Sequence, residues 1–170
     1  MRLFLAVLPD EQARDALVEV QNRMWEAGLR GNYDIRDNLH ITLAYIGEYP
    51  DPDGILDLLE EIQRDRFVLA LQGIGVFRKL YWCGVKENDA LQALTADIRH
   101  RLSDAGIPYD RKKFVPHITL LRKAWSEAGD PYPEIDVPEA SWETGRISLM
   151  KSERMKQGMV YTEIGSIPLI

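Results

Sequence analysis

Two stretches of this chain, NLHITLAYIG at residues 38–47 and VPHITLLRK at residues 115–123, contain the same tetrapeptide, HITL. The copies start at His40 and His117, 77 residues apart, and both stretches are predicted to be β-strands. Because side chains alternate faces along a strand, the histidine and threonine of each copy share one face, roughly 7 Å apart, while the isoleucine and leucine face the opposite way. Each copy therefore offers one imidazole and one hydroxyl above an apolar core.

The same offset aligns other parts of the chain. It places Arg2-Leu3-Phe4 on Lys79-Leu80-Tyr81, and Ala13, Ala16 and Leu17 on Ala90, Ala93 and Leu94. Four of the sixteen pairs in residues 2–17 and 79–94 are identical, so the shared order and spacing carry more weight than the identity. We predict one domain over residues 1–170, built from two β-α-β repeats at about 1–78 and 79–170, each with a further strand, related by an approximate two-fold axis.

Hydrophobic spacing predicts three helices and several more strands. The helices are expected over Asp10–Ala27, Asp51–Arg64 and from Asn88 to about Gly106, with apolar residues at intervals of three and four. The further strands are expected at Arg2–Leu8, Phe67–Phe77, Leu80–Val85, Ile147–Lys151 and Met159–Ile164. Residues 124–140 hold Gly129 and three prolines and are expected to form a long surface loop.

The composition is that of a soluble globular domain. Of the 170 residues, 45% are hydrophobic and 28% charged, and the longest apolar run near either end is Leu3–Leu8, so neither a membrane span nor a signal peptide is expected. The single cysteine, Cys83, excludes an internal disulfide, and we expect a cytoplasmic monomer. The net charge of −6 argues against binding to long duplexes, but it allows a pocket for one or two nucleotides.

The two HITL copies suit acid–base chemistry at phosphorus if their strands face one cleft. Histidine titrates near neutral pH, so one neutral ring can take a proton from water while the other, protonated, gives a proton to a departing oxygen. Thr42 and Thr119 offer hydroxyls to a phosphate, and Arg122 adds a positive charge. This set suits a strained cyclic phosphodiester, without a metal or a covalent intermediate. From the residues alone, His40 and His117 are interchangeable.

Other reactive side chains have simpler interpretations. His100 lies between two arginines on a predicted helix and is expected at the solvated surface, whereas Cys83 is expected in the core. Zinc is disfavoured because no cysteine or acidic partner lies at ligand spacing beside either HITL histidine. The run Arg111-Lys112-Lys113 fits a solvated turn and the steering of an anionic substrate equally well. Tyr81 and Trp82 face opposite ways, so at most one stacks directly on a base.

With these motifs the chain resembles the two-histidine phosphoesterases, and within them the bacterial and archaeal RNA 2′,3′-cyclic phosphodiesterases, also called 2′-5′ RNA ligases. The resemblance spans nearly the whole chain and is carried by RLFLAVLP at 2–9, NLHITLAYIG at 38–47, GVFRKLYWCGV at 75–85 and FVPHITLLRKA at 114–124. Two positions depart from the usual pattern: Tyr45, where phenylalanine is frequent, and Leu121, where alanine is frequent. They bear on the particular substrate more than on the reaction.

The resemblance implies a bilobal α+β fold in which antiparallel sheets meet at a water-filled cleft. It also implies hydrolysis of a 2′,3′-cyclic phosphate, on an RNA end or a nucleotide, to a 2′-phosphomonoester without a metal or other cofactor. By analogy His40 donates the proton to the leaving 3′ oxygen, His117 activates water, and Thr42, Thr119 and Arg122 hold the phosphate. Reversal of the reaction would give weak 2′-5′ ligation.

Two alternatives stay open at this stage. One is an enzyme on the same scaffold that acts on another small cyclic phosphate, such as ADP-ribose 1″,2″-cyclic phosphate, or on a 2′-5′ oligoadenylate. The other is a module that binds a mononucleotide without turning it over. A panel of substrates separates the first alternative from the main hypothesis, and tight binding of AMP without product would favour the second.

Overall fold

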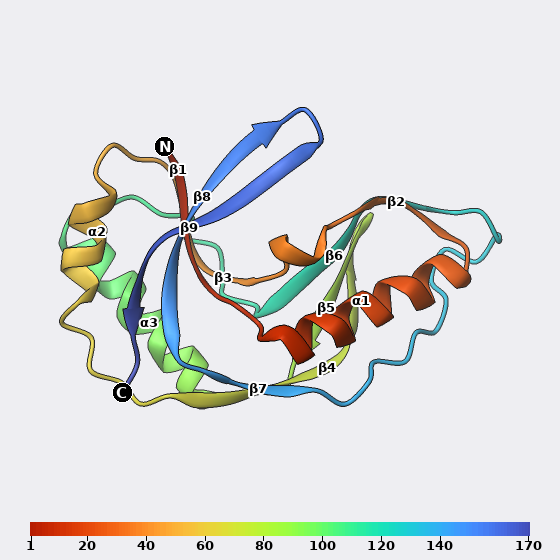
Figure 1. Cartoon of the computed structure of the whole chain (residues 1–170), viewed down its shortest axis with the longest axis horizontal. Helices are drawn as coiled ribbons and strands as arrows, with labels where there is room; N and C mark the ends of the chain where they lie inside the picture. Colours follow the sequence, from red (N-terminus) through yellow and green to blue (C-terminus); the bar gives the residue numbers. More distant parts are fainter.

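Nine strands form a single curled antiparallel sheet in the computed structural model, which describes residues 1–170 (Figure 1). The strands are β1 (Arg2–Val7), β2 (Leu29–Tyr33), β3 (Ile41–Glu48), β4 (Phe67–Phe77), β5 (Leu80–Val85), β6 (His117–Ser126), β7 (Ser141–Thr144), β8 (Arg146–Met155) and β9 (Gly158–Pro168). The helices are α1 (Glu11–Glu26), α2 (Pro52–Leu59), α3 (Asp89–Asp104) and the 3-10 helix η1 (Arg36–Asn38).

The sheet divides into two lobes at its centre. Its strand order is β7-β4-β5-β6-β3-β1-β8-β9, with β2 added to β6. The central strands β3 and β6 pair only through Ile41 and Ile118. One lobe therefore contains β2, β4, β5, β6 and β7, and the other contains β1, β3, β8 and β9. The expected bilobal α+β fold with antiparallel sheets is confirmed.

Equivalent elements of the two halves of the chain start within one residue of the 77-residue offset. β1 pairs with β3, and β5 pairs with β6, while α1 and α3 each have 16 residues and start at Glu11 and Asp89. We propose that these units are the two repeats of a single domain. Each lobe also takes two strands from the other half of the chain: β2 and β4 pair with β6 and β5, and β8 pairs with β1 and with β9.

The helices α1 and α3 have the caps and the buried faces that their sequences predict. The Asp10 side chain accepts a hydrogen bond from the Ala13 amide, and the Asn88 side chain accepts one from the Leu91 amide, so each helix has a side-chain N-cap. The apolar residues at helical spacing are fully or almost fully buried: Ala13, Leu17, Val20 and Met24 in α1, and Leu91, Leu94, Ile98 and Leu102 in α3. These faces anchor the helices to the sheet.

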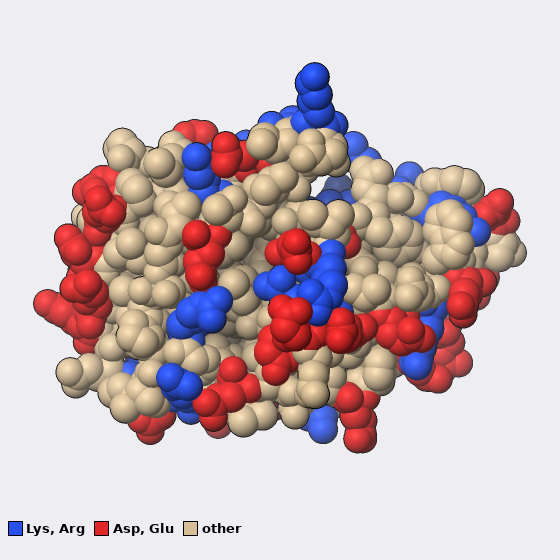
Figure 2. All heavy atoms as spheres, viewed as in Figure 1, with Lys and Arg blue, Asp and Glu red and all other residues tan.

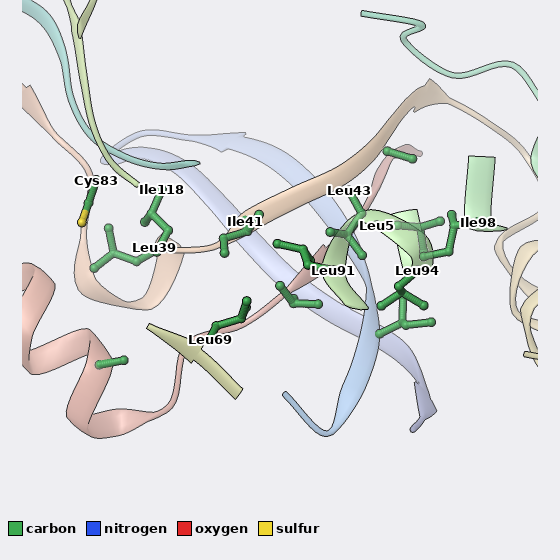
Figure 3. Close-up of a cluster of buried hydrophobic side chains, with 14 of the residues drawn as sticks. Leu5, Leu39, Ile41, Leu43, Leu69, Cys83, Leu91, Leu94, Ile98 and Ile118 are labelled. Carbon is green, nitrogen blue, oxygen red and sulfur yellow. The ribbon is translucent and has the colours of Figure 1, made fainter. Parts of the chain in front are cut away.

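The core lies beneath the two HITL strands. Ile41 and Leu43 of β3 and Ile118 and Leu120 of β6 are completely buried, as strand alternation predicts. Figure 3 shows Ile118 close to Leu39 and Cys83, and Leu43 beside Leu5 and the residues of α3. Cys83 is buried as expected, and burial raises the pKa of its thiol to about 12. Because the isoleucine and leucine of each HITL copy are buried in the core, the histidine and threonine of that copy point away from it.

Several predicted boundaries were wrong. The second helix ends at Leu59 rather than Arg64, because the chain turns there and the Ile62 amide donates to the Leu59 carbonyl. The predicted loop at 124–140 begins later, since β6 continues to Ser126 through pairing with β2, a strand that the sequence did not reveal. β7 was also missed, and β8 and β9 form a longer hairpin than expected.

Acidic side chains gather over the end of the molecule that holds α2 (Figure 2). His100 is exposed and lies 3.2 Å from Asp104, which confirms its predicted place at the surface. No helix is both long enough and apolar enough to cross a membrane.

Candidate active site

A cleft of about 450 Å³ lies over the junction of the two lobes. All five residues predicted for the site line it: His40, Thr42, His117, Thr119 and Arg122. The single pairing of Ile41 with Ile118 explains this convergence, because an antiparallel register carries residue 40 toward residue 119 and residue 42 toward residue 117. Each histidine is thus brought near the threonine of the other HITL copy.

The ring of His40 is held at both nitrogens. Its Nδ1 lies 2.6 Å from the Asn38 carbonyl oxygen. Because a carbonyl can only accept, Nδ1 carries a hydrogen and donates it, so Nε2 of the neutral ring is an acceptor. The Thr42 hydroxyl, 2.9 Å from Nε2, can donate to it. Packing fixes the ring further, since its centroid lies 4.8 Å from that of Phe4 and 5.2 Å from that of Tyr161.

His117 has the same local arrangement. Its Nδ1 donates to the Val115 carbonyl oxygen at 2.6 Å, which again leaves Nε2 of the neutral ring as the acceptor. The rings of Trp82 and Phe77 lie 5.7 and 5.6 Å from the His117 ring. Tyr81, by contrast, is buried on the other face of β5, which confirms the predicted alternation. Both histidines therefore enter the cleft in one defined tautomer.

The surroundings of His40 disfavour its protonated form. Burial lowers the pKa of His40 to about 4, and the positive charges of Arg122 and His117 act in the same direction, against the hydrogen bond to the Asn38 carbonyl. His40 is therefore neutral at pH 7. An anion placed beside it favours the imidazolium form and raises this pKa.

Arg122 is positioned by a buried acid that the sequence did not single out. Its Nε donates to Asp34 Oδ1 at 3.1 Å, and the Asp34 side chain is only 11% exposed. Burial raises the pKa of the Asp34 carboxyl, whereas the Arg122 charge lowers it. With Nε held in this way, the terminal nitrogens of the guanidinium can serve an anion in the cleft.

Sequence reasoning also missed residues that distant strands bring to the cleft. Phe4 of β1 and Tyr161 of β9 line it beside His40. The Asn38 side chain connects β9 to this site, because its Nδ2 donates to the Met159 carbonyl at 2.8 Å and its Oδ1 accepts from the Tyr161 amide at 3.3 Å. None of these contacts leaves a local signal in the sequence.

Tyr45, one of the departures from the family pattern, also lines the cleft. Its hydroxyl accepts a hydrogen bond from Arg2 Nη2 at 2.5 Å. The other departure, Leu121, is completely buried. The hydroxyl that distinguishes Tyr45 from phenylalanine therefore lies near the site, where it can contact a ligand. The buried Leu121 side chain does not line the cleft.

Comparison with known proteins links this chain to one family. A model of the 2'-5' RNA ligase superfamily matches residues 7–156. An RNA 2',3'-cyclic phosphodiesterase of Thermotoga maritima is 28% identical to the chain, covering 95% of this chain and 91% of the relative. One of Thermus thermophilus is 31% identical, covering 99% and 90%.

A solved structure has the same fold over nearly the whole chain. The crystal structure of E. coli LigT complexed with 3'-AMP superposes with a TM-score of 0.86 at 26% identity. The match covers 99% of this chain and 97% of LigT. The likeness therefore includes both lobes and the strands that carry the HITL copies.

Proposed function

The chain belongs to the 2'-5' RNA ligase superfamily, and on this basis we propose that it hydrolyses the 2′,3′-cyclic phosphodiester of an RNA end or a nucleotide to a 2′-phosphomonoester. The observation that carries the proposal is the pair of HITL strands whose histidines and threonines line one cleft. The relatives named RNA 2',3'-cyclic phosphodiesterase support the substrate class. The LigT complex with 3'-AMP supports a nucleotide as ligand.

In the proposed reaction, water attacks phosphorus and the bond from phosphorus to the 3′ oxygen breaks. Nε2 of His117 takes the proton from the attacking water, and protonated Nε2 of His40 gives a proton to the leaving 3′ oxygen. The family resemblance supports this assignment of acid and base. Each transfer contributes roughly 10²–10⁴ to the rate. The product keeps its phosphate on the 2′ oxygen, and the two histidines have exchanged protonation states.

Substrate binding prepares His40 for this role. With its pKa lowered to about 4, His40 is neutral at pH 7. The negative charge of the cyclic phosphate, placed beside Nε2, offsets the positive charges of Arg122 and His117 that oppose protonation. The proton donor is therefore formed mainly in the complex.

The remaining groups would hold the phosphate. The Thr42 and Thr119 hydroxyls can donate to its non-bridging oxygens, and Arg122 can stabilise the charge that grows in the transition state. These donors suffice without a metal or other cofactor. By reversal, a 5′-hydroxyl in place of water would give a 2′-5′ linkage, so weak ligation is part of the proposal. We further propose that the protein acts as a cytoplasmic monomer.

The decisive test is incubation with a nucleoside 2′,3′-cyclic phosphate, with the 2′- and 3′-monophosphate products resolved. We expect mainly the 2′-phosphate, and a rate reduced roughly 10²–10⁴-fold in His40→Ala and in His117→Ala. His100→Ala, which alters the exposed third histidine, serves as the matched control and should retain full activity. Turnover of other small cyclic phosphates alone, or tight binding of AMP without product, would favour the two alternatives.

A further inference from the structure

A second hollow, of about 370 Å³, adjoins the cleft on the side of His117. The two hollows share Thr42, Tyr45, Asp110 and His117. We call the second one the basic groove, and define it by the residues that line it alone: Phe77, Arg99, Lys112, Lys113, Phe114 and Val115. A ligand that reacts at the histidines can therefore extend directly into the basic groove.

The charge of the basic groove is opposite to that of the whole chain. Three cationic residues line it with one acid, Asp110, whereas the chain carries a net charge of −6. Arg99 has a structural role, because its Nε and Nη1 donate to the carbonyls of Leu43 and Lys112 at 3.0 and 2.7 Å. These bonds hold the segment of Lys112 and Lys113 against β3.

The two lysines are left to act on a ligand. Both side chains are exposed, and neither forms an ion pair within the chain. By contrast, Arg122 pairs with Asp34, and Arg99 donates to the Leu43 carbonyl. Asp110 accepts from the backbone amide of Lys112, so the acid shapes the turn while the ammonium group stays free. Close by, Phe77 is 47% exposed and lines the groove, where a base can stack on it.

From this arrangement we propose that the basic groove binds the phosphodiester that joins the terminal nucleotide to the rest of an RNA, with Lys112 and Lys113 as its cationic contacts. The inference rests on the proposed function, which places the cyclic phosphate between His40 and His117. The 5′ oxygen of that nucleotide carries the next phosphate, one nucleotide away. The lysine ammonium group binds such a phosphate through charge attraction, as a point charge. The groove therefore makes the enzyme prefer RNA ends to free nucleoside cyclic phosphates.

The test compares kcat/KM for three substrates: adenosine 2′,3′-cyclic phosphate, the same compound with a 5′-phosphate, and the dinucleotide ApA ending in a 2′,3′-cyclic phosphate. The 5′-phosphate should raise kcat/KM by about twofold to thirtyfold, the range that two exposed ion pairs supply. The variant Lys112→Gln/Lys113→Gln should lose this gain on both phosphate-bearing substrates. Its kcat/KM for the plain cyclic phosphate should be unchanged, because neither lysine lines the catalytic cleft.

A matched control and a salt series sharpen the result. Lys86→Gln removes an exposed lysine that lines neither hollow, and it should keep the full preference. The preference should also fall with salt, with a log–log slope that is smaller by about 0.7 for each lysine removed. Equal kcat/KM for all three substrates in the wild type, or equal losses on all three in the double variant, would overturn the inference and leave the proposed function intact. Hydrolysis of none of them would overturn both.

Discussion

The burial of His40 predicts that this one side chain makes the fold sensitive to acid. Its pKa is about 4 in the folded chain, against the ordinary value of 6.5, because burial disfavours the imidazolium form. Between these two values the unfolded chain binds a proton that the folded chain does not, so stability rises with pH. The contribution of His40 is therefore fully present above pH 6.5 and is lost as the pH falls through 4.

The size of the loss follows from the shift. A difference of about 2.5 units at about 1.4 kcal/mol per unit corresponds to about 3 kcal/mol once the ring is fully protonated in both states. Relative to pH 8, the linkage relation gives a loss of about 2 kcal/mol at pH 5 and about 3 kcal/mol at pH 4. That is a large part of the stability of an ordinary domain.

Urea unfolding of the wild type and of His40→Gln at pH 8, 5 and 4 measures this term. Titrating carboxylates elsewhere are present in both proteins, so the difference between their unfolding free energies isolates the imidazole. Inorganic phosphate at pH 5 should reduce the loss, because the anion favours protonated His40 in the folded state. A difference that stays constant within about 0.5 kcal/mol from pH 8 to pH 4 would refute the reasoning, since the measured shift would then be below half a unit.

Three further predictions concern the catalytic pair and Arg122. The pH dependence of kcat should be bell-shaped, because one histidine must be neutral and the other charged; a plateau across pH 5–9 would contradict this. EDTA should leave the rate of cyclic phosphate hydrolysis unchanged, and loss with EDTA followed by recovery with zinc would argue for a metal enzyme instead. Arg122→Ala should lower the unfolding free energy in urea by about 1–3 kcal/mol, because it leaves the nearly buried Asp34 carboxylate without its partner. A change near zero would contradict a stabilising role for this pair.

The features that could be predicted from the sequence are those carried by short-range patterns. The buried faces of α1 and α3 follow from apolar residues at intervals of three and four. The positions of His40 and His117 on one surface follow from strand alternation and from the repeated tetrapeptide. Even the ring orientation is local, because each Nδ1 donates to the carbonyl two residues earlier.

The features that could not be predicted depend on pairing between distant segments. β2 reads LRGNY, which lacks alternation, and it is a strand only because it lies along β6. Its Gly31 has a φ of 138°, and a Cβ there would lie 2.7 Å from the Arg122 carbonyl oxygen, so this close approach requires glycine. Tyr161 reaches His40 from a strand more than a hundred residues away, through contacts of Asn38 that no local pattern encodes.

The position of β1 has a consequence for how the protein is made. One neighbour of β1 is β3, but the other is β8, which begins about 140 residues after β1 ends. In the nascent chain, β1 therefore lacks its β8 neighbour until residues 146–155 have been made, and its unpaired backbone N–H and C=O groups leave it prone to edge-to-edge association until then. Tyr161, which packs on His40, follows β8 in the next strand. A translation product that stops before these strands lacks both the second pairing partner of β1 and one wall of the site, so the same two strands complete the sheet and the cleft.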